Sequence, residues 1–174
     1  CIMQDRIEAG TYLILGACIG KRLKIEYKES KHLDMLIDIF KKSGIDVVVN
    51  DDYLLVSSVD KVNDMKIICD SYPKLATDLQ QPLSILFTKT ENCSVFEDKI
   101  YPSRYTQIDE LTRMGFKMEV INKKLYVYNS LKIEGEEVSC KDLRGGASLL
   151  IGALMAKGET TINNIHHIKR GYFD

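Results

Sequence analysis

The feature that most constrains the fold of this chain is a unit that occurs three times along it. Charged corners at residues 4–10, 76–82 and 141–146 each lead into an apolar run. The corners are about 70 residues apart, and self-similarity at a regular spacing indicates repeated units that bury one shared core. The repeat also predicts that three acid-bearing corners occupy comparable positions in one fold, where they can build a polar site.

The first two units share one order of predicted elements. In the first unit, an apolar helix over residues 11–20 is followed by a strand over residues 23–27. A second helix follows, for which Ser30 is the expected N-cap. This helix is expected to end at Gly44, and its counterpart in the second unit at Gly115.

Hairpins are expected to complete both units, at residues 45–56 and 116–128. With the strand before each corner included, the order of elements is βαβαββ. The third unit stops at its second helix. The sequence therefore predicts an α+β fold of repeated βαβαββ units, two of them complete and the third incomplete.

Composition excludes several classes of function. A hydrophobic fraction of 45% and a charged fraction of 28% are ordinary for a globular protein. The net charge of −1 gives no reason to expect nucleic acid or an anionic membrane as a partner. No apolar stretch is long enough to span a bilayer and no signal peptide is visible, so we expect a cytoplasmic protein.

The cysteines and histidines indicate neither disulfides nor a metal. The five cysteines are scattered, odd in number and without a CxxC pair, which is typical of reduced thiols. The three histidines have no zinc-ligand spacing. No GxGxxG segment supports a dinucleotide site. We therefore expect no metal and no cofactor.

Five segments, in order along the chain, carry a family resemblance. They are DRIEAGT (residues 5–11), ATDLQ (76–80), IYPSRY with ELTRMG (100–105 and 110–115), DLRGGASL (142–149) and HIKRGY (167–172). Together they resemble the UDP-N-acetylglucosamine enolpyruvyl transferases. Members of this family move enolpyruvate from phosphoenolpyruvate to a sugar hydroxyl in the first committed step of peptidoglycan synthesis.

The resemblance implies two similar domains, each of three βαβαββ units, that close around the substrates UDP-N-acetylglucosamine and phosphoenolpyruvate. Residues 1–174 would be a single domain, one of these two, with the other domain absent. The mobile loop with the reactive cysteine belongs to that other domain, and no cysteine here lies in its sequence context. The first residue is not Met and the third unit is incomplete. We therefore expect part of a longer enzyme that is inactive alone.

The resemblance also assigns catalytic roles. Asp78 corresponds to the base for the 3-hydroxyl of the sugar, a role worth about 10²–10⁴-fold in rate. Asp142 corresponds to an acidic partner near the reacting centre. Arg144 and Arg170 correspond to catalytic arginines that bind phosphoenolpyruvate, since a guanidinium grips planar oxyanions with two hydrogen bonds. The two glycines after Arg144 are expected to let backbone N–H groups approach an anion at a helix start.

Four further residues have implied roles. Arg104 corresponds to a third arginine of the substrate site, and Ile100 to a substrate contact. Asp78, Arg144 and Arg170 also belong to this substrate-binding set. Asp5 and Arg6 correspond to a structural pair at the domain junction.

Simpler explanations compete with these roles. An Asp just before an apolar helix is most often an N-cap, worth about 1 kcal/mol, and this applies to both Asp78 and Asp5. A lone arginine is usually a solvated surface charge. Two other functions also stay open. One is the shikimate-pathway enolpyruvyl transferase, with shikimate 3-phosphate as acceptor, and the other is a non-catalytic module that binds a nucleotide sugar or a protein.

Overall fold

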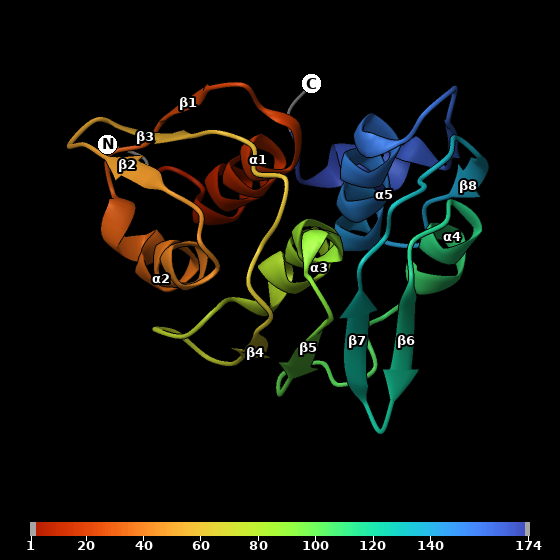
Figure 1. The fold of residues 1–174 in the computed structure, drawn as a ribbon. Coiled ribbons are helices and arrows are strands. Elements are labelled where there is room, and N and C mark those ends of the chain that lie inside the picture. The colour runs from red at the N-terminus through yellow and green to blue at the C-terminus, as the bar shows by residue number, and fades with distance from the viewer. Residues whose placement is uncertain (1–2, 173–174) are drawn as a thin grey trace.

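The computed structural model describes residues 3–172 (Figure 1). Its helices are α1 (Arg6–Ile19), α2 (Asp34–Lys42), α3 (Gln80–Leu86), α4 (Ile108–Arg113) and α5 (Leu143–Met155). Its strands are β1 (Leu23–Glu26), β2 (Val47–Val49), β3 (Tyr53–Val56), β4 (Lys66–Cys69), β5 (Cys93–Asp98), β6 (Met118–Ile121), β7 (Lys124–Tyr128), β8 (Glu137–Ser139) and β9 (Thr161–Asn163). Short 3₁₀ helices cover Ser30–Leu33, Thr77–Leu79, Phe87–Lys89 and Ile165–Arg170. Within residues 3–172, no helix is long and apolar enough to cross a membrane.

Each repeat has its own sheet. The second repeat has the strand order β4-β5-β7-β6, in which β4 and β5 are parallel and β7 is antiparallel to both neighbours. The first repeat has the order β1-β3-β2, which matches β5-β7-β6, and the third has the parallel pair β8-β9, which matches β4-β5. Within the described residues, the second repeat is a full βαβαββ unit and the first has no strand before α1. The predicted α+β class is confirmed.

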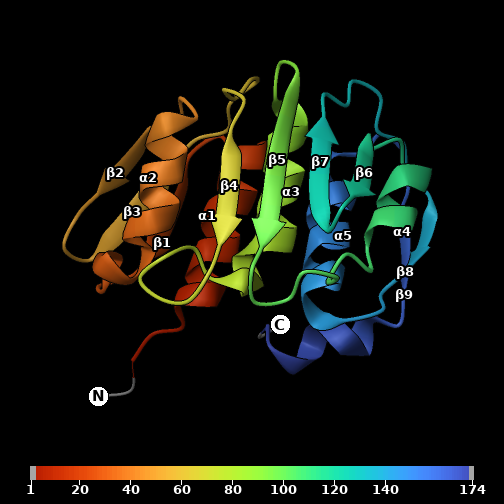
Figure 2. The same ribbon diagram turned by 90° about the horizontal axis from the view of Figure 1, so that it is seen from below.

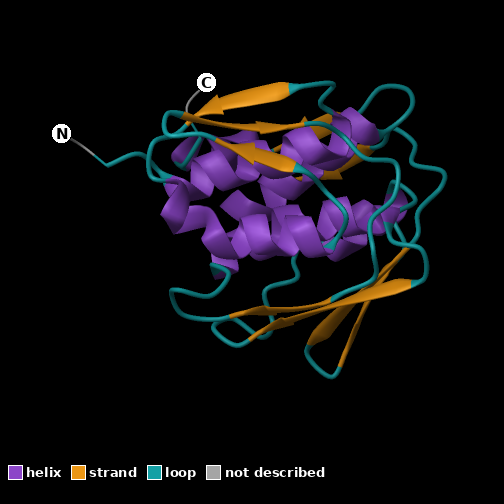
Figure 3. Cartoon of the chain, turned by 60° about the vertical axis from the view of Figure 1, so that its left-hand side comes forward, coloured by secondary structure: helices purple, strands orange, loops and turns teal. Residues whose placement is uncertain are grey.

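The helices lie between the sheets (Figure 2, Figure 3). Helix α3 packs against both α1 and α5, and all seven of its residues are buried. Pro82 lies in its first turn, where the missing N–H breaks no helical hydrogen bond. Leu13 and Ile14 of α1 and Leu149 and Ile151 of α5 are also buried in the core. The three repeats therefore share one helical core, as their spacing predicted.

The predicted turns and hairpins are confirmed. Gly44 and Gly115 have φ angles of 84° and 96°, a region that side chains avoid, and each follows the end of a helix. Strands β2 and β3, and β6 and β7, pair as antiparallel hairpins. Asn122 and Lys123 turn the second hairpin with φ angles of 51° and 63°, which is typical of a two-residue mirror-image turn.

The helix starts differ from the sequence prediction. Helix α1 begins at Arg6 rather than at residue 11, because Asp5 caps it. Ser30 is not an N-cap, since it opens a 3₁₀ helix, and neither that helix nor α2 has a side-chain cap. The corners therefore form the N-terminal ends of the central helices. A Cβ on Gly10 of α1 would lie 2.9 Å from Leu79 Cδ1, so the N-terminal half of α1 packs closely against the 3₁₀ helix that leads into α3.

Candidate functional site

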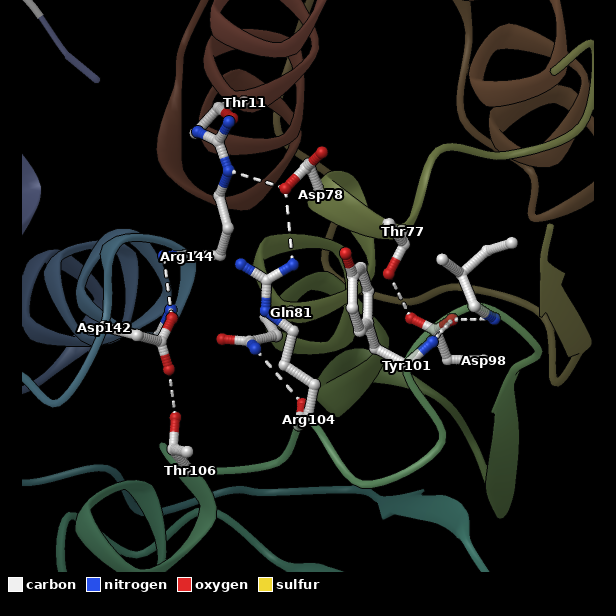
Figure 4. A network of polar contacts seen from close by, with 12 residues as sticks. Thr11, Thr77, Asp78, Gln81, Asp98, Tyr101, Arg104, Thr106, Asp142 and Arg144 are labelled. Atoms are coloured by element: carbon white, nitrogen blue, oxygen red, sulfur yellow. Dashed lines mark hydrogen bonds and ion pairs between the residues drawn. The ribbon is translucent and has the colours of Figure 1, made fainter. Parts of the chain in front are cut away.

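Asp78 lies at the centre of a polar cluster that joins the second and third corners (Figure 4). Its Oδ1 accepts a hydrogen bond from Arg104 Nη1 at 3.4 Å and one from Arg144 Nε at 3.2 Å. The Asp78 side chain is 37% exposed, whereas the Arg104 and Arg144 side chains are 27% and 13% exposed. The carboxylate is therefore accessible from solvent, while the two guanidinium groups that flank it are largely held by the protein.

Asp78 does not cap a helix. Asp78 lies within the 3₁₀ helix Thr77–Leu79, whose N-cap is Ala76, and α3 begins at Gln80 with Leu79 as its N-cap. Neither helix has a side-chain cap hydrogen bond. The capping explanation for Asp78 is wrong, and its carboxylate pairs with arginines instead.

Arg144 is held in place by the first and third repeats together. Its Nη1 donates to the Tyr172 hydroxyl at 3.0 Å, and its guanidinium carbon lies 5.4 Å from the centre of the Tyr172 ring. The Tyr172 hydroxyl shares a second hydrogen bond with Thr11 of α1, at 3.0 Å. Burial lowers the pKa of Arg144, but Tyr172 and Asp78 outweigh burial and raise the pKa overall. The group therefore keeps its charge.

Asp142 is the N-cap of α5. Its Oδ1 accepts from the N–H groups of Arg144 and Gly145 at 3.0 and 2.9 Å, and its Oδ2 from the Thr106 hydroxyl. Partial burial raises the pKa of Asp142, but these hydrogen bonds and the charge of Arg104 outweigh burial and lower the pKa overall. Asp142 is therefore ionised at neutral pH, and it fixes the start of the helix that carries Arg144.

The two glycines after Arg144 do not present free N–H groups. Gly145 donates to the Asp142 side chain and Gly146 to the Asp142 carbonyl. The expectation that they approach an anion is wrong, because the cap already uses these donors. A Cβ on Gly146 would lie 2.6 Å from Ile168 Cγ1. Gly146 therefore allows α5 to pack closely against the 3₁₀ helix Ile165–Arg170.

The loop after β5 carries Arg104 and Ile100. The Arg104 carbonyl accepts from Gln81 Nε2 at 3.1 Å, and its guanidinium carbon lies 5.4 Å from the centre of the Tyr101 ring. Ile100 and Tyr101 are 40% and 55% exposed, although both are apolar or aromatic. Asp98, the last residue of β5, accepts from the N–H groups of both. The loop thus presents apolar and cationic surface beside Asp78.

The other predicted residues lie outside this hydrogen-bonded cluster. Arg170 is exposed, and its side chain forms no hydrogen bond or ion pair with residues 3–172. Asp5 caps α1, with Oδ1 accepting from Ile7 and Glu8 N–H groups at 2.7 and 3.3 Å. The Arg6 guanidinium carbon lies 5.4 Å from the Tyr72 ring centre. Capping is therefore what Asp5 does within this chain.

Sequence reasoning missed several residues that build the site. They are Thr11, Gln81, Asp98, Thr106 and Tyr172. One signal was available for Asp98, since it occupies an inward position of a strand whose burial alternates. An acid at such a position needs hydrogen-bond donors nearby. The contacts of Tyr172 and Thr11 join residues far apart in sequence, and no local pattern indicates them.

The cluster offers proton transfer and anion binding rather than thiol or metal chemistry. A single accessible carboxylate can accept a proton, and the arginines beside it suit a phosphate or a carboxylate. Cys69 and Cys140 are buried, and burial raises the pKa of each thiol. Within the described part of the chain, no three His, Cys, Asp or Glu residues are grouped to hold a metal.

The family model for EPSP synthase (3-phosphoshikimate 1-carboxyvinyltransferase) matches residues 1–174. The chain belongs to the EPSP synthase family. A UDP-N-acetylglucosamine 1-carboxyvinyltransferase 2 from Listeria monocytogenes serotype 4b (strain F2365) is 41% identical over 171 residues. The enzyme of the same name from Bacillus subtilis (strain 168) is 39% identical over 172 residues. Each match covers 98% of this chain and 40% of the relative, so the chain spans about two fifths of the length of these family members.

Solved structures of family members share the fold. The enolpyruvyl transferase NikO from Streptomyces tendae superposes with a TM-score of 0.91 at 25% identity, over 98% of this chain and 41% of NikO. An EPSP synthase from Acinetobacter baumannii superposes with a TM-score of 0.70 at 14% identity, over 99% of this chain and 44% of that enzyme. The resemblance to enolpyruvyl transferases is thus confirmed.

Proposed function

We propose that this chain is one of two globular domains of an enolpyruvyl transferase that uses UDP-N-acetylglucosamine as acceptor. The observation that carries the proposal is the exposed Asp78 carboxylate between the Arg104 and Arg144 guanidinium groups. The names of relatives about 40% identical to this chain support UDP-N-acetylglucosamine as the acceptor. Such an enzyme would act in the cytoplasm and supply peptidoglycan synthesis.

In the proposed reaction, Asp78 takes the proton of the sugar 3-hydroxyl. The hydroxyl oxygen attacks carbon 2 of phosphoenolpyruvate, while an acid from the other domain protonates carbon 3. Carbon 3 of this adduct then gives up a proton as the bond between carbon 2 and the phosphate oxygen breaks, which restores the C=C bond and releases phosphate, while the new C–O bond to the sugar remains. Arg144 and Arg170 would bind phosphoenolpyruvate, and Arg104 would hold Asp78 and substrate together.

Asp142 fits a supporting role in this reaction. It is ionised at neutral pH and its oxygens are occupied by the α5 N–H groups and Thr106. A carboxylate in that state cannot donate a proton, so we assign to Asp142 the placement of Arg144. We assign to Ile100, which is partly exposed beside the cluster, an apolar contact with the sugar.

Shikimate 3-phosphate is the less favoured acceptor. The two EPSP synthase structures from Acinetobacter baumannii are 14% identical to this chain, far below the 41% of a relative named for UDP-N-acetylglucosamine. A non-catalytic module is also disfavoured, because a stand-alone binding domain has no need for an exposed carboxylate between two held arginines.

Phosphate release from phosphoenolpyruvate tests the proposal directly. The full-length protein that contains this domain is expected to release phosphate with UDP-N-acetylglucosamine and not with shikimate 3-phosphate. Residues 1–174 alone are expected to release none, since reacting groups must be assembled within about 3–3.5 Å and both domains supply them. Release with shikimate 3-phosphate alone would overturn the assignment of the acceptor.

A further inference from the structure

We propose that Asp98 is a positioning residue that couples the Asp78 corner to the loop carrying Arg104. The inference rests on the proposed function, because it concerns how the two partners of that site are held together. Asp98 would not touch substrate. It would act through the backbone and through Thr77, the residue before Asp78.

Asp98 is a buried carboxylate whose hydrogen bonds come from two different segments. It is 2% exposed. Its Oδ1 accepts from the N–H groups of Ile100 and Tyr101 at 2.8 and 2.9 Å, and its Oδ2 from the Thr77 hydroxyl. Hydrogen bonds to an ionised group are about twice as strong as neutral ones, and burying the charge without them would be costly.

The strand arrangement explains why these segments meet at Asp98. Strands β4 and β5 are parallel neighbours, with Cys69 opposite Asp98. The segments that follow β4 and β5 therefore leave the sheet at the same end of the strands. The segment after β4 leads to Thr77, and the segment after β5 leads to Arg104. A single carboxylate at this end can fasten both, and in Figure 4 Asp98 lies between Thr77 and Tyr101.

The loop between Asp98 and Arg104 is fixed at both ends. Asp98 holds its start, the Arg104 N–H donates to the Tyr101 carbonyl at 3.1 Å, and Gln81 holds the Arg104 carbonyl. The Arg104 guanidinium then reaches back to Asp78. The contacts form a closed ring from Thr77 through Asp98, Arg104 and Asp78 back to Thr77. Loosening Asp98 should therefore displace Arg104 relative to Asp78.

The chain offers a matched control at the other end of the same two strands. Asp64 precedes β4 and accepts from the N–H groups of Glu91 and Asn92, both at 3.0 Å, and from the Thr90 hydroxyl. These hydrogen bonds lower the pKa of Asp64. Asp64 therefore has the same kinds of hydrogen-bond donors as Asp98, namely two backbone N–H groups and a threonine hydroxyl. Asp64 is more exposed and contacts none of the cluster residues. Removing Asp64 therefore tests the loss of such a carboxylate without disturbing the cluster.

The experiment compares Asp98→Ala, Asp98→Asn and Asp64→Ala in the full-length protein. Asp98→Ala is expected to lower kcat/KM by about 10–100-fold, since small misplacements of reacting groups cost rates of this order. Asp98→Asn keeps the Oδ1 acceptor, and its amide group can donate to the Thr77 hydroxyl. Its kcat/KM should therefore be much closer to that of the wild type than the kcat/KM of Asp98→Ala. Asp64→Ala should lower the melting temperature and leave kcat and KM unchanged. If Asp98→Ala and Asp64→Ala both left kcat and KM unchanged, the positioning role would be refuted.

Hydrogen exchange supplies a readout that does not depend on activity. The Ile100 and Tyr101 amides are expected to exchange about 10-fold faster or more in Asp98→Ala, and the Glu91 and Asn92 amides to do so in Asp64→Ala. Unchanged exchange at Ile100 and Tyr101 would overturn the inference even if the wild-type protein proved inactive. An inactive wild type with the expected exchange pattern would instead count against the proposed function alone. If Asp98→Ala fails to fold, Thr77→Val removes only the link to the Asp78 corner and must itself lower kcat/KM, or the inference fails.

Discussion

Replacing Asp78 with Asn separates a catalytic role from a purely structural one. The substitution keeps shape and the oxygen that accepts from Arg104 and Arg144, and it removes the negative charge and the basic carboxylate. Exposed ion pairs contribute about 0.2–1 kcal/mol each, and Asp78 is 37% exposed. We therefore expect a loss of unfolding free energy near 1 kcal/mol, which shifts the melting temperature by about 2–4 °C in a domain of this size.

The expected kinetic effect is much larger. If Asp78 takes the hydroxyl proton, kcat should fall by about 10²–10⁴-fold, with little change in substrate binding. At about 1.36 kcal/mol for each factor of ten, this is about 2.7–5.4 kcal/mol in the barrier. The barrier therefore rises by several times the loss of stability. That ratio, rather than either number alone, identifies the base.

The assay measures phosphate release and thermal unfolding of the same preparation of full-length protein. Asp38→Asn is the control, because Asp38 pairs with Lys42 at 2.6 Å on the exposed side of α2, away from the cluster. It removes one carboxylate charge and should leave kcat unchanged. Turnover near the wild-type rate in Asp78→Asn would refute the reasoning and leave Asp78 as a structural partner of the two arginines.

Three further predictions follow from the same geometry. Arg144→Lys keeps the charge but loses the planar fork that bonds Asp78 and Tyr172, so steady-state kinetics should show a higher KM for phosphoenolpyruvate together with a lower kcat. Asp142→Ala should lower the free energy of unfolding by about 0.5–2 kcal/mol at neutral pH. The fold lowers the pKa of Asp142. The stabilisation from the ionised Asp142 side chain is therefore present above the unfolded pKa of about 4, and it is lost as the pH falls through the lower folded pKa. Denaturation curves of wild type and variant should accordingly converge in acid. Burial raises the pKa of Cys18 to about 12 and also that of Cys69, so mass spectrometry after alkylation of native protein should find the partly exposed Cys93 labelled well before either.

Much of the fold could be predicted from the sequence because the patterns that indicate it are local. The two glycines that end helices, the hairpin turns and the recurring apolar runs each depend on a few neighbouring residues. Gly44 and Gly115, at which the sequence predicts that two helices end, both adopt positive φ angles. The three-fold recurrence then implied a shared core, and α3 is buried on all sides as that core requires.

The site could be predicted only in part from the sequence, because its geometry depends on contacts between segments that are far apart in the chain. The resemblance named Asp78, Arg104 and Arg144, and the structure brings these together. It could not indicate that Tyr172 holds Arg144 against Thr11, since these contacts join the first and third repeats. Roles in catalysis for all of these residues stay predictions until the variants are measured.

The three corner acids show why residue type alone did not decide function. Asp5 and Asp142 each lie directly before a helix, and each uses its carboxylate to cap that helix. Asp78 lies in the matching corner of the second repeat, but it lies within the 3₁₀ helix Thr77–Leu79 that leads directly into α3. The N-cap positions of the 3₁₀ helix and of α3 are Ala76 and Leu79, so Asp78 occupies neither position and its carboxylate caps neither helix. A difference of two residues in a helix start, which sequence patterns rarely resolve, thus leaves one of three similar carboxylates free to pair with arginines and exposed to solvent.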